Sequence, residues 1–150
     1  ANLAVEDGEF AFLSGNVGRT SDWHFDSGAT SHMSPFESDF VSRARTKKTI
    51  TAAFGGHQPA NFVGKARINI LTADGNRDIT LKDTLHAGVK ARLISVPALD
   101  RAGLTCVFQN GKVCVLKNDG KPVMTGSLID RQYRLDTSLD VEAVSALHFQ

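Results

Sequence analysis

Apolar and polar residues alternate along several short stretches of the chain, and this alternation is typical of half-buried β-strands. It is clearest at Ala66–Leu71, where Ala66, Ile68 and Ile70 share one side and Arg67 and Asn69 the other. The stretches that we predict as strands are Thr49–Phe54, Ala66–Leu71, Ile79–Thr84, Leu104–Phe108, Val113–Leu116 and Gln132–Leu135.

Turn signals separate these stretches at regular intervals. They occur at Phe54–His57, Ala73–Asn76, Asn110-Gly111 and Asn118–Gly120, and glycine with Asn or Asp favours tight hairpin turns. Hairpins at this spacing predict an all-β fold, a closed or folded-over antiparallel barrel.

One helix interrupts the strands. In Ser95–Gly103, Ser95 is suited to cap the helix, Pro97 falls in its first turn, and Gly103 is suited to end it. A second helix is possible at Asp140–Leu147, although the polar stretch before it is equally consistent with a linker.

Composition narrows the class of protein. The 150 residues are 41% hydrophobic and 22% charged, as in an ordinary folded domain, and the net charge of +1 gives no reason to expect nucleic-acid binding. The apolar runs are too short to span a bilayer. Because the chain begins at Ala1 without a recognisable signal sequence, we interpret it as a piece of something longer.

The cysteines and histidines point to neither a disulfide framework nor a metal site. Cys106 and Cys114 lie on predicted neighbouring strands, so a bridge is conceivable, but free thiols are the simpler interpretation. The five histidines and two cysteines lack the spacing of a zinc site. We expect no metal and no cofactor.

The segment with the most chemistry is Trp23–Met33. An aromatic-rich strand leads directly into Asp26, Ser27 and Gly28. A bare Asp-Ser-Gly is usually only a turn. Here Trp23 and Phe25 flank the approach, which suggests a carboxylate delivered into an apolar setting, where burial raises its pKa.

This segment resembles the active-site signature of retropepsin-like aspartic proteases, specifically those of copia-type LTR retrotransposons. Two later segments agree in order: Thr80–Leu85 is similar to a copia-type stretch, and Leu93–Phe108 resembles the end-piece of retropepsins. The resemblance covers roughly residues 23–136. It implies a retropepsin-like antiparallel β-barrel half-lobe with a short helix near residues 96–102 and extra strands after it.

The resemblance also implies aspartic endopeptidase activity, with Asp26 as the catalytic acid and base. Two carboxyls close together share one proton, and this chain has a single Asp-Ser/Thr-Gly. The second carboxyl must then come from another copy in a homodimer. The resemblance implies that Ser27, Gly28, Ala29 and Thr30 support the active-site loop. We interpret His32 as a packed or capping side chain.

A flap and a substrate pocket are further expectations from the family. The flap tip falls on Phe54, Gly55, Gly56 and His57, although a plain β-turn without a mobile role is the alternative. Ala91 and Leu93 are the predicted pocket residues.

The chain departs from the family in two places. Retropepsins commonly have Gly and Arg at the positions of Ser95 and Val96, and the Arg pairs with an Asp where this chain has Thr30. Both partners are absent together, so no buried charge is left unpaired. Residues 109–150 also continue past the usual end, either as added strands of the barrel or as a connection toward a downstream integrase region.

We therefore expect an N-terminal strand or linker at residues 1–21, the protease domain with its extension at 22–136, and a tail or linker at 137–150, possibly helical. Its partners are a second copy, for which Glu9–Leu13 is a candidate contact, and extended peptide segments of its own Gag-Pol polyprotein. The expected location is the cytoplasm, within virus-like particles, without a membrane partner.

Two other functions stay open from the sequence. A domesticated, catalytically silent barrel that serves as an interaction module would keep the same fold. Nucleic-acid binding by the basic run Arg43–Lys48 is a weaker alternative, because such runs usually form a solvated surface.

Overall fold

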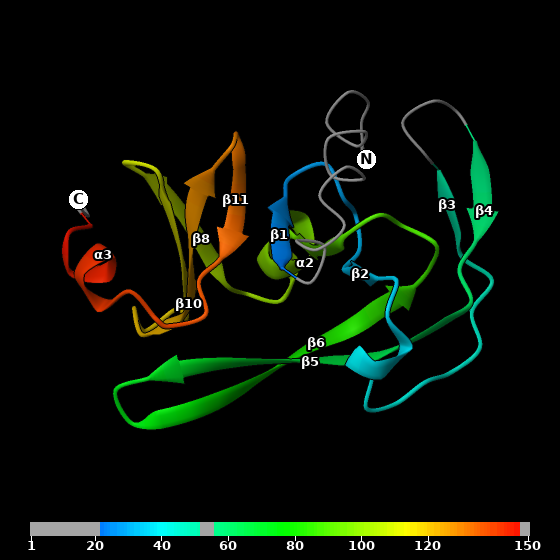
Figure 1. Ribbon diagram of the computed structural model, residues 1–150, viewed down its shortest axis with the longest axis horizontal. Helices are drawn as coiled ribbons and strands as arrows, with labels where there is room; N and C mark the ends of the chain where they lie inside the picture. Colours follow the sequence, from blue (N-terminus) through cyan, green and yellow to red (C-terminus); the bar gives the residue numbers. More distant parts are fainter. Residues whose placement is uncertain (1–21, 52–55, 148–150) are drawn as a thin grey trace.

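A computed structural model describes residues 22–51 and 56–147, and its strands form one long, strongly curved sheet and a separate hairpin (Figure 1). The sheet has the order β5-β6-β2-β7-β1-β11-β10-β9-β8, and β3 pairs only with β4. The strands are β1 (Trp23–Asp26), β2 (Met33–Ser34), β3 (Thr49–Thr51), β4 (His57–Pro59), β5 (Phe62–Thr72), β6 (Gly75–His86), β7 (Arg92–Ser95), β8 (Thr105–Gln109), β9 (Lys112–Leu116), β10 (Pro122–Ile129) and β11 (Gln132–Leu135). The helical segments are η2 (Glu37–Asp39), α2 (Val96–Arg101) and α3 (Val141–Ser145).

The prediction of an all-β, barrel-like domain is confirmed, and the strands flanking Asp26 add a feature that hairpin spacing did not predict. β1 runs parallel to β7, with Asp26 opposite Ser95, and β2 runs parallel to β6. The other pairings between these named strands are antiparallel. Parallel neighbours need a long crossover, which explains why a pattern of short turns does not reveal them.

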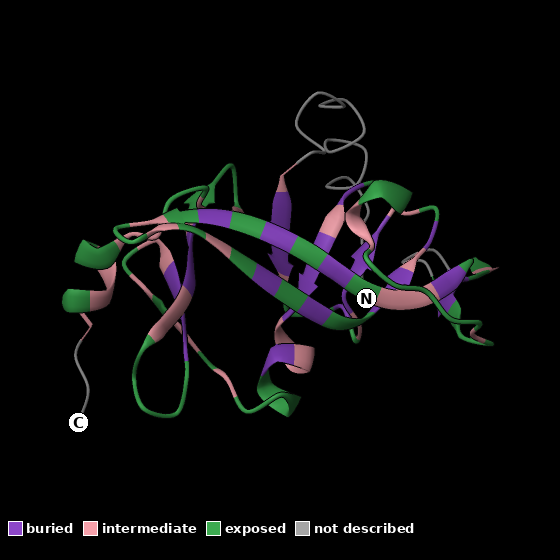
Figure 2. Ribbon diagram, turned by 90° about the horizontal axis from the view of Figure 1, so that it is seen from below, coloured by how far each residue is buried: buried purple, intermediate pink, exposed green. Residues whose placement is uncertain are grey.

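The long β5–β6 hairpin follows from its alternation. Ile68 and Ile70 are buried while Arg67 and Asn69 between them are exposed, and Figure 2 shows the resulting bands along both strands. Burying each isoleucine contributes about 1.5–3 kcal/mol. The turn forms at Gly75, whose φ of 108° suits glycine.

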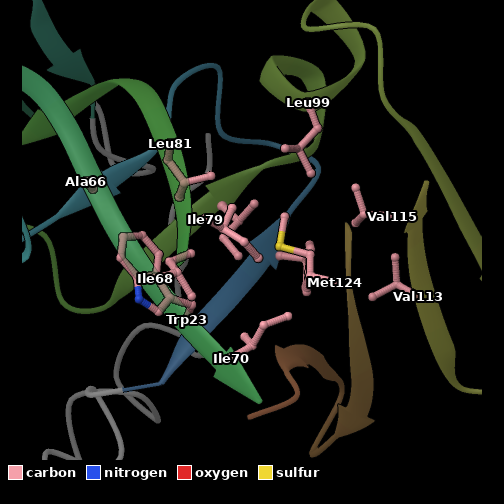
Figure 3. Packing of buried hydrophobic residues seen from close by; sticks show 12 residues of the cluster. Trp23, Ala66, Ile68, Ile70, Ile79, Leu81, Leu99, Val113, Val115 and Met124 are labelled. Carbon is pink, nitrogen blue, oxygen red and sulfur yellow. The ribbon is translucent and has the colours of Figure 1, made fainter. Parts of the chain in front are cut away.

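The larger core lies between this hairpin, α2 and the C-terminal strands. Figure 3 shows Ile68, Ile70 and Ile79 on one side, with Met124 and Val115 on the other. A smaller core gathers residues from the loop after β1, from β2 and β3, and from the ends of β6 and β7. Its members are Ala29, Met33, Ile50, Ala60, Leu85, Ala87, Ala91 and Leu93. It is this smaller core that positions the loop after Asp26.

The C-terminal strands belong to the same sheet. β11 pairs directly with β1, with Tyr133 opposite Phe25, and β8 to β10 continue outward from it. The chain then forms the helix α3, which Asp140 caps by accepting a hydrogen bond of 3.0 Å from the Ala143 N–H. The sequence leaves residues 109–150 open to two interpretations, added strands of the barrel or a connection to a downstream region. In the structure, the strands of this segment belong to the sheet.

The two cysteines are free thiols. On β8 and β9, Cys106 faces Val115, whereas Cys114 faces Val107. The two side chains are therefore one position out of register and project from opposite faces of the sheet. Across residues 22–51 and 56–147, no helix has the length and apolar character needed to cross a membrane.

Candidate active-site loop

Asp26 is the last residue of β1, at the point where the buried strand becomes a surface turn. Trp23 and Phe25 pack into the larger core, and Asp26 itself is half-buried. Its Oδ1 accepts a hydrogen bond of 2.7 Å from the Gly28 N–H. Burial raises the pKa of Asp26 above its ordinary value, and the Gly28 N–H opposes that shift by stabilising the carboxylate.

The loop that follows is anchored at one residue and open around it. Ala29 is completely buried in the smaller core, next to residues such as Met33 and Leu93. Ser27, Gly28 and Thr30 are exposed. The buried Ala29 side chain thus attaches the loop to the smaller core, while the residues around it are open to solvent.

Helix α2 braces this loop through side chains at both of its ends. The Ser95 hydroxyl, which caps the helix by accepting from the Ala98 N–H at 3.0 Å, donates a 2.6 Å hydrogen bond to the Ala29 carbonyl. Arg101, in the last turn, donates through its guanidinium to the Thr30 carbonyl at 2.7 Å. Arg101 thereby links the helix to the loop in a chain that lacks the Arg–Asp pair expected of retropepsins.

His32 completes the brace as a packed, neutral histidine. It is 5% exposed, and its Nδ1 accepts a 2.9 Å hydrogen bond from the Ser95 N–H. Burial, followed by the positive charge of Arg101, lowers the pKa of His32 to about 4. This geometry agrees with the interpretation of His32 as a packed side chain. The sequence did not indicate that Ser95 is its partner.

The described part of the segment predicted as a flap lies near this loop. Phe54 and Gly55 fall outside the described residues. Gly56 is exposed, and His57 starts β4 and contacts the Thr51 hydroxyl at 3.2 Å through Nδ1. At the base of the hairpin, Ile50 packs in the smaller core with Ala29.

A cavity of about 390 Å³ separates the loop from β3. Its lining comes from the loop after Asp26, from β2 and β3, and from β6. The residues are Thr30, Ser31, Met33, Lys48, Thr49, Ile50, Thr51 and Leu85.

The two predicted pocket residues occupy the core of the chain. Ala91, just before β7, is 2% exposed and Leu93, on β7, is 3% exposed, and both belong to the smaller core. Leu93 packs under the loop with Ala29. Pocket lining by these two residues stays a prediction.

Sequence reasoning also missed a buried polar group beside the site. His24 precedes Asp26 by two residues, so both lie on the same face of β1. Its side chain is buried, and neither ring nitrogen has a hydrogen-bond partner among the described residues. Burial, and next the nearby charge of Arg134, lowers the pKa of His24 to about 4. Its position between Trp23 and Phe25 was the available signal.

Comparison with protein families finds a match that covers β1, the loop after it and α2. A family model described as "Pol polyprotein, beta-barrel domain" matches residues 23–104, more than half of the chain. The chain belongs to the Pol polyprotein beta-barrel domain family. It therefore corresponds to a region of a retroelement Pol polyprotein. No curated protein matches the chain.

The matched part of this Pol beta-barrel domain contains the loop after Asp26 together with Ser95 and Arg101, which hydrogen-bond that loop. It starts at the first residue of β1 and ends at Leu104, after α2. The strands β8 to β11 lie beyond it. Among the described residues, no group of three or more His, Cys, Asp or Glu side chains is placed to hold a metal ion. The chemistry available at the loop is that of a carboxyl group with a raised pKa, backbone N–H groups and hydroxyls.

Proposed function

We propose that this Pol beta-barrel domain is the aspartic endopeptidase of a copia-type retrotransposon and cleaves its own Gag-Pol polyprotein as a homodimer. The observation that carries the proposal is the half-buried Asp26 carboxyl at the end of β1, with a raised pKa and a backbone N–H on one oxygen. A carboxyl that holds its proton more readily than usual is suited to general acid–base chemistry.

The requirement for two copies follows from the chemistry. One carboxylate takes a proton from a water molecule while a protonated partner donates to the developing oxyanion. The sequence has only one Asp-Ser-Gly, at Asp26. Because Ser27 and Gly28 are exposed beside it, the loop is open to an identical loop across a two-fold axis.

In this dimer the two Asp26 carboxyls share one proton, since two adjacent negative charges are unfavourable. The ionised carboxyl activates the water, which attacks the carbonyl carbon of the scissile peptide. The tetrahedral intermediate then collapses: the C–N bond breaks, and the amine leaves with the proton that the carboxyl took from the water. Ser27 bonds the partner loop, and Gly28 leaves room for the substrate main chain.

The substrate is an extended peptide that adds as a strand between the loop and the β3–β4 hairpin. The cavity of about 390 Å³ between these elements supports this placement. Closure of the hairpin over the peptide excludes water from the two carboxyls. The proposed setting is the cytoplasm, within virus-like particles.

The test uses the purified chain, its Asp26→Asn variant and a polyprotein fragment with the natural sequences on both sides of the chain. Mass spectrometry of the products should find defined cleavage with the unaltered chain and none with Asp26→Asn. A statine-type inhibitor should block the reaction. Undiminished cleavage by Asp26→Asn would contradict the proposal, and a folded dimer without activity would favour the silent interaction module.

A further inference from the structure

A second, larger cavity lies beside α2, on the other side of Ser31 from the 390 Å³ cavity. Its volume is about 630 Å³, and it shares Ser31 and Lys48 with the smaller cavity. The two are therefore neighbouring parts of one depression that starts at the active-site loop. The proposed function as described above makes no use of the larger part, which we call the α2 cavity.

The charged groups that line the α2 cavity are mostly positive. Lys48, Lys82 and Arg101 line it, against a single acidic residue, Asp83. Its apolar walls come from β5, β6, α2 and β10. They include Val63, Ile79, Leu81, Leu99 and Met124.

His32 adds a neutral hydrogen-bond donor to the lining of the α2 cavity. The Ser95 N–H donates to its Nδ1, so the ring of this neutral histidine carries its proton on Nε2. The side chain is 5% exposed and lines the α2 cavity, and Nε2 has no hydrogen-bond partner among the described residues. Nε2 is not among the buried atoms that lack a partner, so its N–H is open to solvent and can donate to water or to a ligand.

The backbone at the cavity wall is also irregular. The pairing of β5 with β6 shifts register between Gly64 and Ala66, where β6 has one extra residue, and Asp83 in this bulge has a φ of 55°. Such a φ is uncommon outside glycine, although asparagine and aspartate adopt it more often than other residues. Bulges recur next to functional sites because they redirect side chains. Here the bulge carries Lys82 and Asp83, which both line the cavity.

We propose that the α2 cavity binds a carboxylate side chain of the extended peptide substrate, at a position away from the scissile bond. A carboxylate is a hydrogen-bond acceptor only, so it complements the His32 Nε2–H and the lysine and arginine groups together. This inference rests on the proposed function for its peptide ligand.

The test measures binding in the full chain carrying Asp26→Asn, so that no cleavage intervenes. Two acetylated and amidated pentapeptides serve as probes, Val-Leu-Glu-Leu-Val and its Gln counterpart. NMR titration at low salt should give at least about threefold tighter binding for the Glu peptide, as expected for an exposed ion pair plus a charge-assisted hydrogen bond. The His32 Nε2–H resonance should shift with the Glu peptide.

A pair of matched variants assigns the effect to the cavity. Lys82→Gln removes a charge from the lining and should reduce the preference for Glu over Gln. Lys90→Gln removes an exposed charge that does not line the cavity and should leave the preference unchanged. Equal affinity for the two peptides, no detectable binding of either, or binding without a shift at His32 would each overturn the inference.

The outcome is separable from that of the proposed function. Cleavage by the unaltered chain together with equal peptide affinities removes the carboxylate site alone. Preferred binding of the Glu peptide by a chain that never cleaves leaves a peptide-binding site and removes the protease.

Discussion

Asp26 and Ser95 are register partners in the parallel pair of β1 and β7. One residue ends the strand that delivers the carboxyl, and the other starts the helix that braces the loop. The Ser95 side chain bonds the loop at Ala29, and its main-chain N–H bonds His32. The position of the Asp26 loop is therefore set by Ser95 as much as by the strand that bears it.

Replacing Ser95 tests this coupling. Ser95→Ala removes the cap of α2 and leaves the Ala29 carbonyl without its donor, so we expect a loss of about 2 kcal/mol in the free energy of unfolding. Cleavage should fall as well, because the loop loses a support. Urea unfolding and the cleavage assay measure the two effects.

Ser145→Ala is the matched control, because Ser145 is an exposed serine in α3. Its stability should remain within about 0.5 kcal/mol of the unaltered chain. Equal stability of the Ser95→Ala and Ser145→Ala proteins would show that the bond to Ala29 does not support the fold.

A second prediction concerns a glycine that makes room for the strand before Asp26. A Cβ on Gly126 would lie 2.7 Å from the Phe25 ring and 2.8 Å from both the Arg134 carbonyl and a Val113 methyl. Because two of these neighbours are packed side chains and one is backbone, Gly126→Ala should destabilise the fold by roughly 1–3 kcal/mol. Thermal unfolding measures the change.

Gly56→Ala provides the comparison for this experiment, since a Cβ at Gly56 meets nothing within 4 Å. It should unfold at nearly the same temperature as the unaltered chain. A Gly126→Ala protein as stable as Gly56→Ala would mean that β10 and Phe25 do not pack as described.

The two buried histidines predict how stability depends on pH. Burial lowers the pKa of both His24 and His32 from 6.5 to about 4. Between these values the unfolded chain binds protons that the folded chain does not, so stability decreases as the pH falls from about 6.5 to about 4, by about 3 kcal/mol for each histidine. The raised pKa of Asp26 acts in the opposite direction, because its ionisation penalises the fold as the pH rises.

His24→Leu should remove about half of the histidine contribution and stabilise the fold at neutral pH, since the His24 ring nitrogens have no partner among the described residues. Urea unfolding at a series of pH values measures both effects. His57→Gln alters an exposed histidine and should keep the original slope. A slope unchanged by His24→Leu would contradict the burial of this ring.

The local parts of the fold were predictable because their signals are local. The alternation of Ile68 and Ile70 with polar residues predicts β5, and Asn110-Gly111 predicts a tight turn that the structure forms with φ values of 54° and 76°. Ser95 and Gly103 mark the limits of α2, and Gly103 has a φ of 88°.

What the sequence could not predict depends on distant contacts. β10 begins at Pro122 and contains Gly126, which argue against a strand until the close approach of Phe25 is known. The parallel pairing of β1 with β7 joins segments far apart in the chain. In the candidate site, Asp26 was predictable from its motif, whereas the roles of Ser95 and Arg101 depend on where α2 packs.

The most direct test of the central claim mixes the unaltered chain with its Asp26→Asn variant. If each active site needs one Asp26 carboxyl from each of two copies, mixed dimers are inactive. A fourfold excess of Asp26→Asn is added to a fixed amount of the unaltered chain and equilibrated at a concentration where the chain is dimeric by sedimentation. Cleavage should fall to about one fifth of the rate that the same amount of unaltered chain gives alone. A rate unaffected by the excess variant would show that a single copy is sufficient, and would contradict the shared-carboxyl account.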